Sequence, residues 1–351
     1  MKRNTVLLFL SIILVASSGW AQNVTSAGSH TPGPHIVSID YDALYQMPKP
    51  PEYKRFGFYG AFLFSVAKQE TPMAVDFARS TPDNVSQTMD VVFKNIDGIK
   101  LGLDLYQPSK DDTPNPLILI THGGAWKAGD KALYRSYGID FAALGYTVAS
   151  INYRLSGQAP FPAAIEDIRD SIVYLRKNAT KFNIDPKRLV IFGSSAGGHL
   201  SAFTGLAANT PGASYLSGID AKTIKAIISI YGAHNLTSPA HRNHEETRSF
   251  IGKSYADAPE LYREASTISH VDKNDPPVLL IHGTVDSIVP VQNSDALSQK
   301  LKEAGVPVTY DRIEGWPHVM DFFSPIGERT LWQCYNFLKT HVPSDEMLKN
   351  K

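Results

Sequence analysis

A serine lies between two glycines in the segment GSSAG, residues 193–197. An apolar run at 189–192 precedes this segment and helix-forming sequence follows it, so the order is buried strand, sharp turn, helix. At the centre of such a turn Ser195 has a strained backbone, and the residues two positions away on either side must be small. Ser194 lacks glycines at these positions. The segment therefore predicts Ser195 as a nucleophile, unless the glycines form a plain turn whose serines cap a helix.

A serine hydroxyl needs a base to take its proton and a carboxylate to hold that base. Asp286 follows the apolar segment 277–281, and His318 follows the segment 306–313. Both come after Ser195, in the order serine, acid, histidine. The carboxyl ends of parallel strands share one edge of a sheet, so the three side chains are expected to meet there. The sequence thus predicts a catalytic triad.

The tetrahedral intermediate of such a reaction needs backbone N–H donors for its oxyanion. The segment THGGAW, residues 121–126, follows a predicted strand, and its glycines let backbone amides face a cavity. A further donor is predicted at Ala196, where the helix dipole favours negative charge. Trp126, which ends the segment, is a candidate substrate contact. Taken alone, THGGAW also fits a plain turn.

Other polar residues suggest different chemistry. His282 ends a predicted strand and His199 opens the helix after the serine, and both are expected to pack as structural residues. His241, His244 and Glu245 invite a metal site, but the order H-x-x-H-E is not that of a zincin and no clear third ligand follows. We therefore expect neither a metal nor another cofactor.

Strands and helices alternate from about residue 89 onward. A hairpin is predicted around Asp97-Gly98. Further strands are predicted at 116–121, 146–152, 188–192, 224–230, 277–281 and 306–313, and helices at 132–144, 162–181, 295–304 and 329–338. This alternation predicts an α/β fold with a mostly parallel central sheet and helices on both faces. The segment 232–275 interrupts it at the carboxyl edge, which favours a lid or substrate wall.

The first 21 residues have the pattern of a signal peptide. Lys2 and Arg3 precede an apolar run at 6–15, and small residues suited to cleavage end at Ala21. Ten apolar residues are too few to span a bilayer, so we expect no stable membrane anchor and a secreted or periplasmic protein.

The remaining chain divides into two parts. Residues 22–85 are predicted as an N-terminal arm and residues 86–345 as the catalytic domain. The arm contains an aromatic-rich segment, 53–64, that fits either a sugar-stacking or acyl-binding surface or a segment packed on the domain.

Composition narrows the choice of partners. The 351 residues include 34 basic and 34 acidic side chains, which predicts neither nucleic acid nor an anionic membrane as a partner. An apolar content of 43% fits a globular domain. Cys334 is the single cysteine, so no intrachain disulfide can form, and its neighbours predict a buried helix.

The chain resembles the α/β-hydrolases, and more narrowly the hormone-sensitive-lipase-like carboxylesterases and the bacterial carbohydrate esterases that remove acetyl or feruloyl groups from xylan. The matching segments are HGGAW (122–126), NYRL (152–155), FPAAIEDI (161–168), GSSAGGH (193–199), HGTVD (282–286) and the loop of His318. The family usually has a third glycine where this chain has Ala125. An alanine amide can still donate, which favours Gly124, Ala125 and Ala196 as the oxyanion donors.

The resemblance implies a serine carboxylesterase that acts through an acyl-enzyme on a small-molecule or polysaccharide ester. The alternatives are a prolyl-oligopeptidase-like peptidase, a general lipase or carboxylesterase for small acyl esters, and a catalytically silent binding protein. The acyl group, the alcohol and the oligomeric state are not specified by the sequence.

Overall fold

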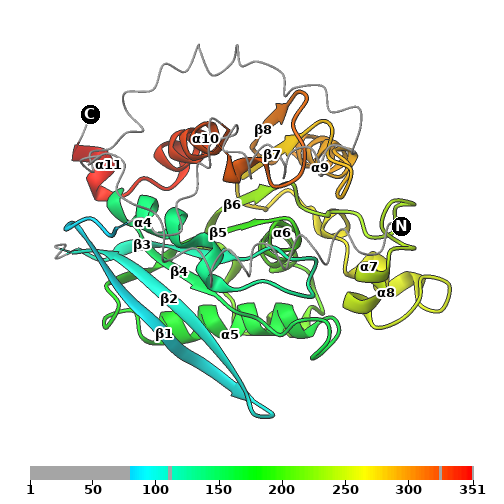
Figure 1. Ribbon diagram of the computed structural model, residues 1–351, viewed down its shortest axis with the longest axis horizontal. Coiled ribbons are helices and arrows are strands. Elements are labelled where there is room, and N and C mark those ends of the chain that lie inside the picture. The colour runs from blue at the N-terminus through cyan, green and yellow to red at the C-terminus, as the bar shows by residue number, and fades with distance from the viewer. Residues whose placement is uncertain (1–79, 110–112, 324–325, 350–351) are drawn as a thin grey trace, which may run out of the picture.

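A computed structural model of the chain describes residues 80–109, 113–323 and 326–349 (Figure 1). The predicted signal peptide, nearly all of the predicted N-terminal arm and its aromatic-rich segment lie outside these residues. The catalytic domain predicted for 86–345 lies almost entirely within them.

The described strands form one eight-stranded sheet in the order β1-β2-β4-β3-β5-β6-β7-β8. The strands are β1 (Val85–Ile96), β2 (Ile99–Pro108), β3 (Asn115–Thr121), β4 (Thr147–Ile151), β5 (Ile184–Ser194), β6 (Ile224–Ile230), β7 (Val278–Gly283) and β8 (Val308–Ile313). β2 pairs antiparallel with β1 and with β4, and all other neighbouring strands are parallel. The predicted mostly parallel sheet is confirmed. Figure 1 shows that the β1–β2 hairpin at the edge of this sheet projects past the other strands.

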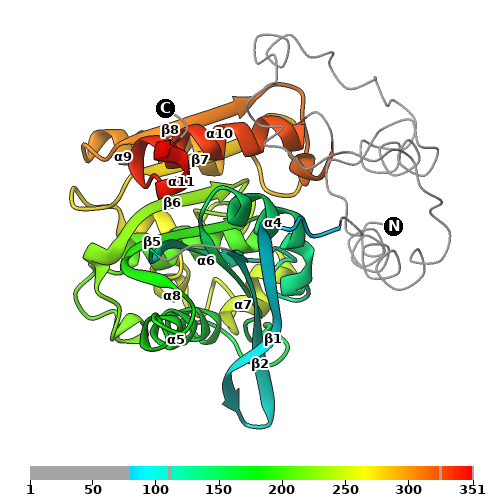
Figure 2. The ribbon, with the colours of Figure 1, turned by 90° about the vertical axis from the view of Figure 1, so that its left-hand side faces the viewer.

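Helices cover both faces of this sheet, and two separate hydrophobic cores result. Leu117 and Leu119 of β3 belong to the core under α5 (Ala163–Lys177), α6 (Ala196–Ala207) and α9 (Gln292–Glu303). Ile118 and Ile120, which alternate with them, belong to the core under α4 (Arg135–Ala143) and α10 (Ile326–His341). Figure 2 shows α5 and α10 on opposite sides of the sheet. A strand buried on both faces explains why the predicted strand at 116–121 is apolar throughout.

Some boundaries differ from the predicted ones. The segment predicted as one helix at 132–144 is divided into a 3-10 turn, Lys131–Tyr134, and α4. β5 begins at Ile184, four residues before its predicted start at 188, because Asn115 and Pro116 of β3 pair with Ile184 and Asp185. Pairing between strands, rather than apolar periodicity, sets this boundary.

The C-terminal part of the chain returns to the middle of the sheet. The last described helix, α11 (Asp345–Lys349), follows α10. The Tyr146 hydroxyl, just before β4, donates to the Val342 carbonyl at 2.8 Å, and the Ser344 hydroxyl donates to the carbonyl of Leu144. Cys334 is buried in α10, as predicted.

The segment between β6 and β7 contains two short helices, α7 (Glu245–Ile251) and α8 (Pro259–Glu264), and a 3-10 turn, Thr267–His270. We call residues 232–275 the insertion. Phe250 and Tyr262 bury their rings in the core of the α5 and α6 face, so the insertion packs on the domain. Its role as a lid or substrate wall stays a prediction.

Candidate active site

The turn after β5 has the geometry that its glycines predict. Ser195 has φ +54° and ψ −122°, a conformation that L-residues rarely adopt. A Cβ on Gly193 would lie 2.3 Å from the Gly197 carbonyl oxygen, and one on Gly197 would lie 2.0 Å from the Thr121 carbonyl oxygen. Only glycine fits at either position, and the turn presents Ser195 at the N-terminus of α6.

Three loops bring a serine, a histidine and an aspartate together at the carboxyl edge of the sheet. His318 Nε2 lies 2.8 Å from Ser195 Oγ, and His318 Nδ1 lies 2.6 Å from Asp286 Oδ2. The serine follows β5, the aspartate follows β7 and the histidine follows β8. A carboxylate can only accept, so Nδ1 carries the proton and the lone pair of Nε2 faces the serine hydroxyl. This arrangement can deprotonate the serine.

Asp286 is held as an anion by several donors. Its Oδ1 accepts from the backbone amides of Ile288 and Val289, each at 2.9 Å. Burial alone raises the pKa of this carboxyl, but the electrostatic interaction with His318 and the hydrogen bonds from His282 and His318 outweigh burial and lower the pKa below its ordinary value. The carboxylate therefore stays ionised and fixes the orientation of the His318 ring.

His282 is closer to the site than its expected packing role suggests. Its Nε2 lies 3.2 Å from Asp286 Oδ2 and 2.8 Å from the Val289 carbonyl oxygen, while Nδ1 lies 2.8 Å from Ser294 Oγ. The ring is fully buried. Its place four residues before Asp286, at the end of a strand, is the sequence signal that could have indicated this contact.

The segment 122–126 forms a strained loop beside the elbow, which we call the oxyanion loop. Gly124, Ala125 and Trp126 all have positive φ, at +120°, +54° and +57°. A Cβ on Gly123 would lie 3.2 Å from Ser195 Cβ, so the loop backbone lies against the serine. Among the described residues, the amides of Gly124, Ala125 and Ala196 have no hydrogen-bond acceptor. They are free to bind an oxyanion.

Tyr153 and Ser156 support the oxyanion loop from the segment after β4. The Tyr153 hydroxyl donates to the His122 carbonyl at 3.0 Å, and the two rings stack with centroids 4.3 Å apart. The Ser156 amide donates to the Trp126 carbonyl at 2.7 Å. The matching segment NYRL thus contacts the matching segment HGGAW.

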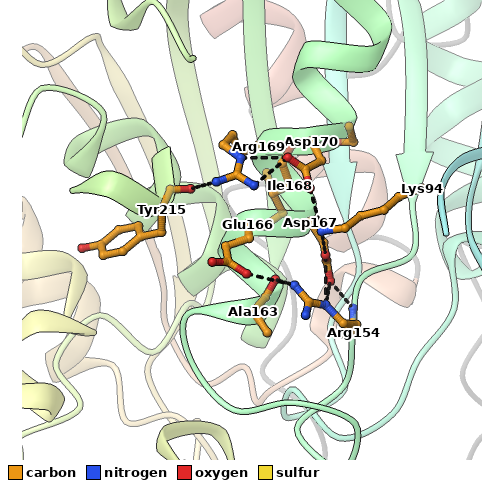
Figure 3. Close-up of polar contacts among 10 residues, drawn as sticks. Lys94, Arg154, Ala163, Glu166, Asp167, Ile168, Arg169, Asp170 and Tyr215 are labelled. Atoms are coloured by element: carbon orange, nitrogen blue, oxygen red, sulfur yellow. Dashed lines mark hydrogen bonds and ion pairs between the residues drawn. The ribbon is translucent and has the colours of Figure 1, made fainter. Parts of the chain in front are cut away.

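A buried charge network anchors this supporting segment to α5 (Figure 3). Arg154 Nε lies 2.8 Å from Asp167 Oδ2, and its Nη2 donates to the Ala163 carbonyl and to Glu166 Oε2 at 3.0 and 3.1 Å. Lys94 of β1 reaches Asp167 from the other side at 2.6 Å. Asp167 is fully buried, and its charge is balanced by two cations.

The predicted substrate contact Trp126 has a side chain that is only 5% exposed. Its indole stacks on Phe250 of the insertion, with centroids 4.7 Å apart, and its Nε1–H donates to His199 Nδ1 at 3.1 Å. The indole therefore lies between α6 and α7 rather than in open solvent.

A second polar cluster underlies the triad and was not indicated by the sequence. Asp321 is fully buried and accepts from the hydroxyls of Tyr137, at 3.0 Å, and Tyr231. Burial raises the pKa of its carboxyl. The Tyr231 ring lies 4.4 Å from the His318 ring, and the hydroxyl of Ser194 is bonded to Tyr134, which leaves Ser194 turned away from the nucleophile position.

The residues that invited a metal site do not converge. His241 Nε2 bonds Asn293 Nδ2 at 3.0 Å, whereas His244 is more than half exposed and lies 3.9 Å from Glu246. Within residues 80–109, 113–323 and 326–349, no group of three or more histidine, cysteine or acidic side chains could hold a metal ion. No described helix has the length and apolar character needed to cross a membrane.

The fold and this geometry define an α/β-hydrolase with a serine, a histidine and an aspartate in contact at the sheet edge. The BD-FAE family model matches residues 103–301, more than half of the chain. The chain belongs to the BD-FAE family.

Two curated relatives are named as esterases. Esterase LipC and esterase LipQ of Mycobacterium tuberculosis are 33% and 32% identical to this chain. The alignments cover 62% and 61% of this chain and 55% and 52% of the relatives, so the chain spans about half the length of the curated relatives it matches.

Solved structures agree with this assignment. The truncated form of a carbohydrate esterase from gut microbiota is 28% identical, with a TM-score of 0.63 over 76% of this chain and 98% of that chain. A bifunctional GH43-CE protein of Bacteroides eggerthii is 27% identical, with a TM-score of 0.63 over 72% of this chain and 38% of that chain. These solved structures share the α/β-hydrolase fold of this chain.

Proposed function

We propose that this protein is a serine carboxylesterase in which Ser195, His318 and Asp286 form the catalytic triad. The observation that carries the proposal is the continuous contact from Ser195 Oγ through the His318 ring to the Asp286 carboxylate, at 2.8 and 2.6 Å. The backbone amides of Gly124, Ala125 and Ala196, which have no hydrogen-bond acceptor among the described residues, support the same proposal.

The proposed reaction has two half-reactions. His318 Nε2 takes the proton of Ser195 as Oγ attacks the ester carbonyl carbon, and the carbonyl electron pair moves to the oxygen, which the free amides bind. The protonated His318 then gives that proton to the alcohol oxygen as the carbon–oxygen bond breaks, leaving an acyl-enzyme. In the second half, water attacks the acyl carbon with His318 as base, and the acid and free Ser195 are released.

We propose acetyl or feruloyl esters on a xylan-type polysaccharide as the substrate. Support comes from the sequence resemblance and from the two solved relatives whose titles name a carbohydrate esterase and a GH43-CE protein. The names of the curated relatives, esterase LipC and esterase LipQ, favour a second candidate, a general carboxylesterase for small acyl esters.

A substrate panel separates these candidates. We expect wild type to release acid from p-nitrophenyl acetate, and Ser195→Ala to lose at least about 1,000-fold of that rate, because the nucleophile is removed. If Ser195→Ala keeps most of the activity, the proposed mechanism is wrong. Acetylated xylan, feruloylated xylan and longer acyl esters then identify the substrate class, and peptide cleavage without ester turnover would indicate a peptidase.

We also propose that the chain is exported. Support comes from the basic, apolar and small-residue pattern of residues 1–21, and N-terminal sequencing of the mature protein tests for cleavage after Ala21.

A further inference from the structure

Trp126 is fixed on three sides at the end of the oxyanion loop. Its indole N–H donates to His199, its ring stacks on Phe250 with an interplanar angle of 19°, and its carbonyl accepts from Ser156. These partners come from α6, from the insertion and from the segment after β4. A side chain held in this way cannot swing toward a substrate without breaking several contacts.

His199 of α6 joins the oxyanion loop to the insertion. It lies four residues after Ser195 on α6, where Nδ1 accepts from the Trp126 indole and Nε2 donates to the Ala265 carbonyl of the insertion at 2.8 Å. The two contacts define one tautomer, with the proton on Nε2, and they require a neutral ring. Burial lowers the pKa of His199 to about 4, so the ring is neutral at ordinary pH.

The backbone of the oxyanion loop needs such an anchor. Two successive non-glycine residues, Ala125 and Trp126, have positive φ, which is a strained backbone conformation for L-residues. Without a restraint, the loop would relax toward ordinary dihedral angles, and the free amides of Gly124 and Ala125 would leave their present positions. In the segment from 123 to 126 only Trp126 has a side chain large enough to supply the restraint.

We propose that Trp126 and His199 are positioning residues that hold the oxyanion amides in place, and that the insertion contributes to catalysis by bracing them through Phe250 and Ala265. The inference deepens the proposed function and rests on it. It replaces direct substrate contact with support of the transition state as the role of Trp126.

Matched variants test the pair. Trp126→Phe keeps one aromatic ring to stack on Phe250 and removes the N–H donor together with the second ring of the indole. His199→Leu removes both polar contacts, whereas His199→Gln offers an amide oxygen and an amide N–H in their place. For p-nitrophenyl acetate we expect kcat to fall about 10- to 100-fold in Trp126→Phe and His199→Leu, with KM changed less than about 2-fold. We expect His199→Gln to recover most of the loss.

A second readout reports on the oxyanion amides themselves. A boronic acid that forms a tetrahedral adduct with Ser195 should lose affinity by the same factor as kcat in each variant. The double variant Trp126→Phe/His199→Leu should be no worse than His199→Leu alone, because the hydrogen bond that Trp126→Phe removes is already absent in His199→Leu. Titration of folded active sites with a fluorophosphonate corrects each rate for protein that has not folded, and His244→Leu, an exposed histidine of the insertion, is the control.

The outcomes separate the two proposals. Unchanged kcat and adduct affinity in Trp126→Phe and His199→Leu would overturn the positioning role while Ser195→Ala remains inactive and the proposed function stands. A rise in KM that depends on the acyl group, with kcat unchanged, would instead make Trp126 a substrate contact. Ester hydrolysis that survives in Ser195→Ala would overturn the proposed function itself.

Discussion

Backbone strain is concentrated around the candidate active site. Of the eight described non-glycine residues with positive φ, five lie in the site or beside it: Ala125, Trp126, Ser195, Tyr231 and Val319. The other three are Asp90, Asp97 and Asn183, types that tolerate this conformation in turns. Strain at residues that do not favour it requires support from the surrounding structure, which the contacts of Trp126 and Tyr231 supply.

The elbow glycines provide a test at the scale of a single atom. We expect Gly197→Ala to destabilise the protein by about 3 kcal/mol or more and to abolish ester hydrolysis, because its Cβ would lie 2.0 Å from the Thr121 carbonyl oxygen. Gly157→Ala is the matched control, since a Cβ there meets nothing within 4 Å. Urea denaturation and p-nitrophenyl acetate turnover measure both effects, and an active, stable Gly197→Ala variant would contradict the steric argument.

At this scale the sequence predicts what depends on local geometry. The glycine spacing around Ser195 avoids a clash between residues that are close in the chain, so the sharp turn could be predicted from the sequence. The contacts of His282 with Asp286 and of Tyr231 with Asp321 and His318 depend on tertiary packing. No spacing rule relates Tyr231 to Asp321, 90 residues apart, and their cluster could not be predicted.

Among the elements, the segment after β4 makes the contacts that position the oxyanion loop. Tyr153 and Ser156 contact the oxyanion loop, while Arg154 between them is bound to Asp167 of α5. Lys94 of β1 contacts the same carboxylate. The antiparallel hairpin at the sheet edge is therefore linked to the loop beside Ser195 through one buried anion, Asp167.

Replacing that anion should be costly. We expect Asp167→Asn to lower the free energy of unfolding by about 3 kcal/mol or more, because it leaves the Arg154 and Lys94 charges without a buried partner. Asp170→Asn, whose carboxylate is partly exposed and also contacts Lys94, should cost less than about 1 kcal/mol. Equal losses in urea denaturation would show that burial of Asp167 has no special effect.

The strands and helices themselves could largely be predicted from the sequence, and the exceptions are boundaries of elements. Strands and helices with apolar periodicity appear near their predicted positions, and the sheet is mostly parallel as expected. The early start of β5 and the division of the 132–144 segment arise from pairing with β3 and from contacts of Lys131 with Asp90 and Asp104. Contacts between distant segments override local pattern in both cases.

Across the whole molecule, buried histidines link stability to pH. Burial lowers the pKa of His122, His199 and His241 to about 4 and that of His234 well below its ordinary value. In the unfolded chain these groups titrate near 6.5. Between these values the unfolded state binds more protons, so the folded state loses stability as the pH falls from about 6.5 toward 4.

We expect the free energy of unfolding in urea to decrease steadily over that pH range. Burial raises the pKa of Asp275 to about 7, so this carboxyl acts in the opposite direction: it stabilises the fold at low pH and loses that effect as the pH rises through 7. Four histidines outweigh it. Asp275→Asn should therefore make the decrease steeper, and stability that is flat or rising toward pH 4 would contradict this account.

The return of the chain end to β4 has a consequence for the order of events during synthesis. Tyr146 bonds the Val342 carbonyl, 196 residues later, and its hydroxyl also meets the sulfur of Met347 at 3.2 Å. A ribosome that has completed β4 still has more than half of the chain to make before these partners exist. The apolar residues beside β4 therefore stay exposed until residues 342–347 have been made, so this part of the core is completed late in folding.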